Sequence, residues 1–202
     1  MKRLVLLLLV AALTGCGGGG DAKSPGKRTL WPAPPDAMKL TQDAGLTPET
    51  HEFVNLHVHA HLDVFLNGQP IVVPAGIGID IDNPAVKQGK TGDGSTGYGG
   101  IEPPCSKPCI SPLHTHATDG VLHTEAKAQQ FNTLGEFFIQ WGVRLDAKCV
   151  GEYCRPATQV SAYVDGKKYS GDPRKIAIED KREIAIVIGT PPDEIPSGVG
   201  GG

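Results

Sequence analysis

The chain has 202 residues, with 19 lysine and arginine side chains against 22 aspartate and glutamate side chains and a formal net charge of −3 at pH 7. This weakly acidic balance, without a basic run, argues against a nucleic-acid partner and against electrostatic attachment to anionic lipid. The length suits a single domain.

The N-terminus has the pattern of an export signal. Lys2 and Arg3 precede the apolar stretch Leu4–Leu13, which is too short to span a bilayer. We therefore assign residues 1–15 to a signal peptide and leave them out of the fold. The sequence Leu-Thr-Gly-Cys that ends at Cys16 resembles the lipobox of bacterial lipoproteins. That resemblance implies a lipidated Cys16 as mature N-terminus and anchorage to the cell membrane or outer membrane, facing the periplasm or exterior. An ordinary cleaved secretion signal is the alternative.

The next segment is expected to be a tether. Glycine, proline and lysine dominate its first half, a composition typical of flexible linkers. We predict a lipidated cysteine and flexible tether over residues 16–50, with a short helical turn near residues 37–42.

Export also determines how the other cysteines are interpreted. Cysteines in an oxidising compartment usually form disulfides. The local pairs Cys105–Cys109 and Cys149–Cys154 are the simplest expectation. A four-cysteine zinc site is the alternative, and Cys109 could be a soft metal ligand if it is left unpaired. The disulfide candidates are Cys105, Cys109, Cys149 and Cys154.

The first predicted strand, about residues 53–66, alternates between two kinds of residue. His57, His59, His61 and Asp63 share one face, while small and branched apolar residues occupy the other, because successive side chains of a strand point to opposite sides. The strand ends at Asn67-Gly68, a strong hairpin signal, and the resulting register places Val64 opposite Ile71.

A second histidine-rich stretch, LHTHATDGVLHTE, covers residues 113–125. Asp119-Gly120 is also a hairpin signal. If it forms a two-residue loop, His116 faces His123 and His114 faces Glu125, and all four side chains lie on one face of the hairpin.

The remainder predicts one helix and further strands. Thr133 and Glu136 fit a capping box, and Gly142 ends the apolar helical pattern. Hairpins are expected over residues 160–169 and 176–188. The fold class is therefore mainly β: a compact single domain of several β-hairpins, barrel- or sandwich-like, with one short α-helix. The histidine-rich β domain is expected to cover residues 51–190, and residues 191–202 to be a disordered tail.

The two histidine-rich strands predict a transition-metal site, mono- or dinuclear. Imidazole ligands suit zinc or copper, and the sequence does not choose between them. Nearby acidic residues could orient the histidine rings. The predicted ligands are His57, His59, His61, His114, His116 and His123, with Glu125, Asp63 and Asp119 around them.

Residues 55–190 resemble a group of exported bacterial and archaeal proteins. Four motifs carry the resemblance in the same order: HxHxHLxVFxNGQ, VPAGIGI, LHTH-x₂-DGVxHxE and TLGEFFxxWGVRL. The resemblance implies that the histidine motifs belong together, and it brings no activity with it.

Three functions follow from these patterns. The first is an envelope-anchored lipoprotein that binds zinc or copper for sequestration, sensing or delivery to a metal-accepting protein partner. The second is a metal-dependent hydrolase, lyase or oxidase with an open three-histidine site. The third is a structural or interaction lipoprotein with a pH-responsive histidine face.

Overall fold

The computed structural model describes residues 28–198, which form a mainly β fold with 33% strand and 11% helix. This confirms the predicted fold class, and the helical turn expected near residues 37–42 is a second α-helix. Its elements in chain order are α1 (Ala37–Asp43), β1 (Leu56–Leu66), β2 (Gln69–Ile71), β3 (Lys87–Lys90), β4 (Thr96–Gly99), β5 (Leu113–His114), β6 (Val121–Ala126), β7 (Asn132–Thr133), α2 (Leu134–Trp141), β8 (Cys149–Val150), β9 (Tyr153–Cys154), β10 (Val160–Val164), β11 (Lys167–Tyr169), a 3₁₀ turn (Pro173–Lys175), β12 (Ala177–Ile178) and β13 (Glu183–Ile188).

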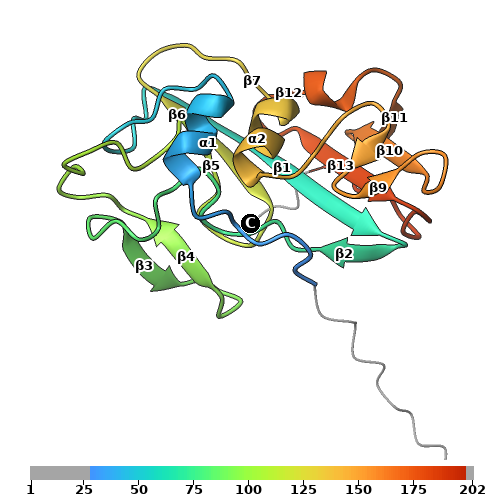
Figure 1. The fold of residues 1–202 in the computed structure, drawn as a ribbon, viewed down its shortest axis with the longest axis horizontal. Coiled ribbons are helices and arrows are strands. Elements are labelled where there is room, and N and C mark those ends of the chain that lie inside the picture. The colour runs from blue at the N-terminus through green and yellow to red at the C-terminus, as the bar shows by residue number, and fades with distance from the viewer. Residues whose placement is uncertain (1–27, 199–202) are drawn as a thin grey trace, which may run out of the picture.

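The main sheet is open, and its described strands form no closed barrel. Its order is β11-β10-β13-β1-β6-β5, with β2 paired to part of β1 (Figure 1). β1 runs parallel to β13 and antiparallel to β6. The parallel pair joins segments separated by more than a hundred residues, so it brings together side chains that a hairpin pattern cannot connect.

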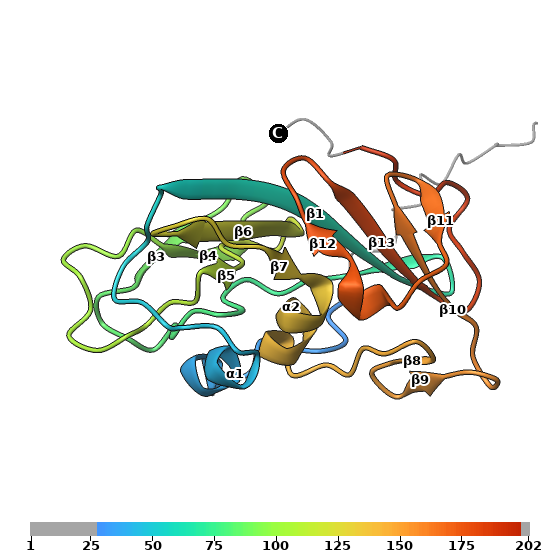
Figure 2. The same cartoon turned by 90° about the horizontal axis from the view of Figure 1, so that it is seen from above.

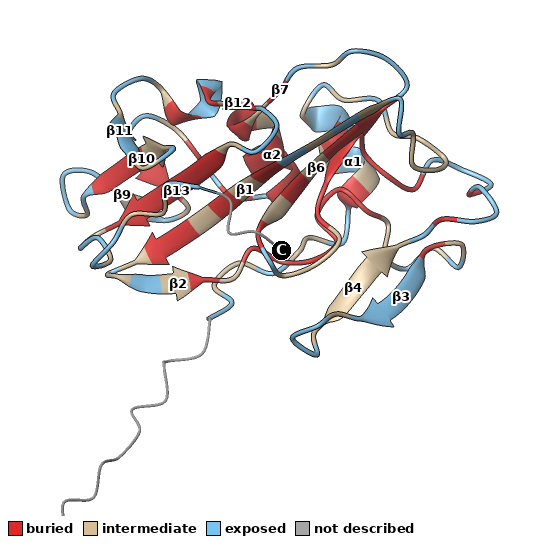
Figure 3. Ribbon diagram, turned by 180° about the vertical axis from the view of Figure 1, so that it is seen from behind, coloured by how far each residue is buried: buried red, intermediate tan, exposed pale blue. Residues whose placement is uncertain are grey.

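The helices cover one face of this sheet (Figure 2). Leu134, Phe137 and Trp141 of α2 are buried in the same core cluster as Leu62 and Ile186 of the sheet. Thr133 accepts from the Glu136 amide and completes the predicted capping box, while Gly142 ends the helix in the left-handed region at φ 69°. β13 is buried along its length, β1 is buried mainly in its second half, and β3 is exposed along its length (Figure 3).

Of the four predicted hairpins, two have the expected register, the one around Asp119-Gly120 has a different register, and one does not form. Val64 pairs with Ile71 around Asn67-Gly68, as the register predicts. The turn after Val164 likewise joins β10 to β11. Residues 176–188, however, do not form a hairpin: β12 pairs with β7, and β13 lies between β10 and β1. The six residues of β13 are all buried, because alternate side chains pack into the main core cluster on one face and into a second cluster on the other.

The segments expected to be tether and tail are in part packed against the domain. Leu30, Trp31 and Leu46 lie against the main core, and the Trp141 indole donates to the Trp31 carbonyl at 3.1 Å. At the other end, Ile195 packs on a second cluster that contains Phe65. These apolar contacts hold residues that composition alone assigned to linkers. The signal peptide and Cys16 lie outside the described residues. Between residues 28 and 198, neither helix has the length or apolar content needed to cross a membrane.

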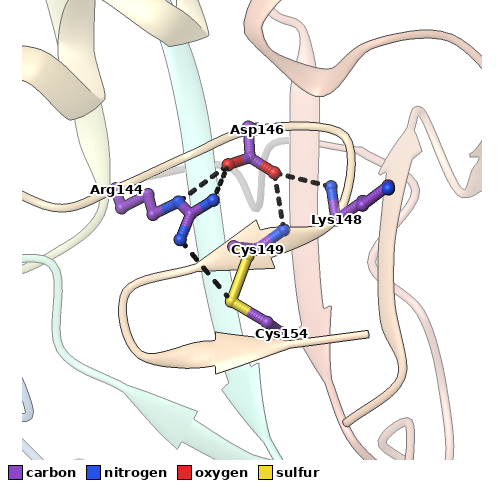
Figure 4. Close-up of a disulfide and its surroundings, with 5 residues drawn as sticks. All are labelled: Arg144, Asp146, Lys148, Cys149 and Cys154. Atoms are coloured by element: carbon purple, nitrogen blue, oxygen red, sulfur yellow. Dashed lines mark hydrogen bonds and ion pairs between the residues drawn. A yellow bond between two sulfur atoms is a disulfide. The ribbon is translucent and has the colours of Figure 1, made fainter. Parts of the chain in front are cut away.

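Both local cysteine pairs are disulfides, Cys105–Cys109 and Cys149–Cys154. The second staples the short β8–β9 hairpin (Figure 4). Asp146 accepts from the backbone amides of residues 148 and 149 and pairs with Arg144 at 2.7 Å. With its sulfur engaged in the first disulfide, Cys109 offers no thiolate to a metal.

Candidate metal centre

The sheet brings the two histidine-rich segments together on the face opposite the helices. In the β1–β6 pair, His59 lies opposite His123 and His57 opposite Glu125. On the other side of β6, His114 also lies opposite His123. Paired residues of neighbouring strands project from the same face, so the side chains of β6 lie between those of β1 and β5.

The register of the second segment differs from the predicted one. His114 faces His123 rather than Glu125, and His116 lies beyond the end of β5 in the connecting loop. The cause is Thr115, whose hydroxyl donates to the Pro74 carbonyl at 2.7 Å and whose backbone amide donates to Ile77. These bonds draw the chain away from β6 before the turn at residues 119–120.

The ring of His116 nevertheless lies close to that of His114. The Nδ1–H of His114 donates to the Ser111 carbonyl at 2.9 Å, and the Nδ1–H of His116 donates to the Tyr98 carbonyl at 2.6 Å. A neutral ring with a proton on Nδ1 carries a lone pair on Nε2. The two Nε2 atoms are 3.0 Å apart. Two lone pairs at this separation repel each other unless a proton or a metal ion lies between them.

A second pair of rings lies across β6. The Nε2 atoms of His57 and His59 are 2.8 Å apart. Nitrogens on one tetrahedral zinc lie about 3.3 Å apart, and those at a right angle on copper about 2.8 Å, for metal–nitrogen bonds of about 2.0 Å. Both observed separations therefore fit a shared metal ion after small shifts of the rings.

Glu125 and His123 lie between the two pairs. Glu125 Oε1 is 3.1 Å from His57 Nε2 and 3.3 Å from His123 Nδ1, while Oε2 is 3.9 Å from His114 Nε2. Each pair forms, with these two residues, a group of four ligand atoms that lie within 4.8 Å of one another. We call the whole set the histidine cluster, which consists of His57, His59, His114, His116, His123 and Glu125.

Burial and charge prepare the histidine cluster for a cation. Burial, with the nearby His116 and His123 rings, lowers the pKa of His114 to about 3. Burial also lowers the pKa of His59, with help from His123 and His57. Although burial works to raise the pKa of Glu125, the hydrogen bond from His123 and the surrounding rings lower it to about 2. At neutral pH, His114 and His59 are therefore unprotonated beside an ionised carboxylate, the state that metal binding requires.

His61 lies apart from the other five predicted ligands. Its Nδ1 is 3.0 Å from a Glu183 oxygen, and its Nε2 is 2.8 Å from the Asp119 carbonyl. The Glu183 hydrogen bond raises the pKa of His61 to about 9 despite burial. The ring is thus an imidazolium that donates from both nitrogens. His61, Asp63 and Glu183 could also converge on an ion. Both ring nitrogens of His61 are already engaged in hydrogen bonds, however, so we describe the group as an ion pair.

The sequence predicted the acidic residues around the histidines only in part. Glu125 lies within the histidine cluster instead of behind it, and Asp63 is 3.7 Å from His61. Asp119 contributes its backbone carbonyl to His61, and its carboxylate accepts from the Val121 amide.

Glu183 was missed because only the parallel β1–β13 pairing places it opposite His61. The backbone acceptors for His114 and His116 leave no signal in the sequence.

Comparison with protein-family models, with curated proteins and with solved structures finds no match to this chain.

Proposed function

We propose that this protein binds a transition metal ion, zinc or copper, through the histidine cluster, and that it acquires and hands over the ion at the cell envelope as a lipid-anchored protein. The observation that carries the proposal is the His114–His116 pair. Both Nδ1 protons are committed to backbone carbonyls, so two Nε2 lone pairs converge at 3.0 Å. A metal ion bound by imidazole satisfies both at once.

The exposure of the ligands favours exchange. The side chain of His57 is 44% exposed, whereas that of His114 is 1% exposed. The histidine cluster therefore runs from the surface into the sheet, and an ion can enter or leave through His57 and His59 without unfolding the domain. The lipobox-like sequence supports the envelope location, and a metal-accepting protein is the partner this role implies.

Metal content tests the proposal. The full chain would be produced without a histidine tag in an oxidising compartment, purified in mild detergent and exposed to micromolar zinc or copper. We expect at least one ion per chain by elemental analysis, and none in the double variant His59→Ala/His116→Ala. His51→Ala is the matched control, because His51 packs against Phe53 outside the histidine cluster. Absence of bound metal in the unaltered chain would overturn the proposal.

A further inference from the structure

The histidine cluster contains more ligands than one ion uses. Five imidazoles and a carboxylate exceed the four positions of a tetrahedral zinc site. They are also not gathered around one point. One pair of close Nε2 atoms belongs to β1 and the other to β5 and its loop, on opposite sides of β6.

The residues of β6 face both pairs. The ring of His123 lies 4.5 Å from that of His59 and 4.4 Å from that of His116, measured between centroids. The two oxygens of Glu125 divide in the same way: Oε1 lies near His57 and Oε2 lies toward His114. A carboxylate with one oxygen toward each of two ligand pairs has the arrangement that bridges two metal ions.

We propose that the histidine cluster holds two metal ions, an outer ion on His57 and His59 and an inner ion on His114 and His116, joined by the Glu125 carboxylate. This inference rests on the proposed function and specifies its stoichiometry. His123 of β6 supplies a further ring nitrogen between the two pairs. The carboxylate offsets part of the repulsion between the two cations, which explains why a buried acid lies among histidines.

The two ions are expected to exchange at different rates. The outer pair is exposed, while His114 is fully buried and both inner rings are fixed by backbone carbonyls. Preorganised, buried ligands release an ion more slowly than exposed ones. The inner ion would therefore be retained while the outer ion is transferred to a partner.

Single variants distinguish a site for one ion from a centre that holds two. The full chain, untagged and in mild detergent, would be titrated with zinc and weighed by native mass spectrometry. We expect two ions in the unaltered chain and in His51→Ala, and one ion in both His59→Ala and His116→Ala. His116→Gln serves as a second inner-pair variant in case the alanine disturbs the loop, and circular dichroism would confirm that each variant is folded.

Copper(II) provides a second measurement on the same proteins. Two bridged copper ions should give a half-field electron paramagnetic resonance signal that is missing from His59→Ala and His116→Ala. Glu125→Gln, which keeps the shape but loses the charge and one acceptor oxygen, should bind the second ion at least tenfold more weakly while retaining the first.

The outcomes distinguish this inference from the function on which it rests. One ion in the unaltered chain, abolished by either single histidine variant, would overturn the two-ion centre and leave the proposed function standing. No ion at all would overturn both. Two ions that persist in His59→Ala would also overturn the assignment, because the outer ion would then lie elsewhere.

Discussion

His59 and His61 lie two residues apart on the same face of the same strand, yet their surroundings give them opposite chemistry. His59 faces the imidazole of His123 on β6, and burial lowers its pKa. His61 faces Glu183 across the parallel neighbour β13, and both of its ring nitrogens have oxygen partners. One strand therefore carries an imidazole that could hold a metal ion and, two residues away, a structural cation, and the neighbouring strand makes the difference.

The largest effect on stability should come from removing Glu183, the partner of His61. Glu183→Ala leaves the His61 ring without its buried partner, which typically destabilises a protein by about 3 kcal/mol. Zinc affinity, measured by calorimetry, should stay within about threefold of the unaltered protein, because Glu183 lies outside the histidine cluster. Urea unfolding measures the stability. A large loss of zinc affinity with little loss of stability would reverse the roles assigned to His59 and His61.

Metal should stabilise the fold by binding to the histidine cluster that contains His59. An ion that binds only the folded state adds about 2.7 kcal/mol at a hundred times its Kd, which corresponds to a rise in Tm of about 5–10 °C for a domain of this size. The rise should disappear with a chelator and in His59→Ala/His116→Ala, and it should persist in Glu183→Ala. Differential scanning calorimetry with zinc or copper provides the measurement. An unchanged Tm at saturating metal would contradict the account.

The pH dependence of stability should reveal His61 directly. Its pKa is raised to about 9 in the folded protein from an ordinary value of 6.5. The stabilisation is therefore fully present below pH 6.5 and is lost as the pH rises through 9. In chelator, the difference in unfolding free energy between the unaltered protein and Glu183→Gln should be about 1–3 kcal/mol at pH 6 and much smaller at pH 9.5. A difference that grows with pH would show that His61 is not the cation.

The smallest effect should come from the helix that supports the sheet from behind. Thr133→Ala removes the side-chain cap of α2 and should cost about 1 kcal/mol. Metal stoichiometry should be unchanged, because α2 lies on the opposite face of β1 from the histidines. Thr158→Ala, in a loop away from the helix, is a matched control. Altered stoichiometry in Thr133→Ala would mean that the two faces of the sheet are coupled.

Alternating side chains and turn residues, which are local signals in the sequence, allowed part of the fold to be predicted. The alternation of residues 56–66 and the turns at Asn67 and Asp165 determined faces and registers correctly, because hairpins pair residues that are close in sequence. The same rule failed at residues 113–125. There Asp119-Gly120 suggested a two-residue loop, but contacts of Thr115 with residues 74–77 decided where the strand ended.

Pairings between distant segments could not be read from the pattern. Nothing in residues 183–188 identifies β1 as their parallel neighbour, so the Glu183 partner of His61 was unpredictable and His61 was grouped with the ligands by its spacing alone. Trp31 was likewise assigned to a tether, because its contact with Trp141 depends on the assembled core. The sequence thus predicted which residue types meet, and tertiary contacts determined their roles.

Anomalous diffraction at the zinc absorption edge, from crystals of the zinc-loaded protein, would test the central claim most directly. The account predicts scattering peaks at about 2.0–2.1 Å from Nε2 of His114 and His116 and of His57 and His59, with none beside His61. A peak confined to His61, Asp63 and Glu183, or no peak in the histidine cluster, would contradict it.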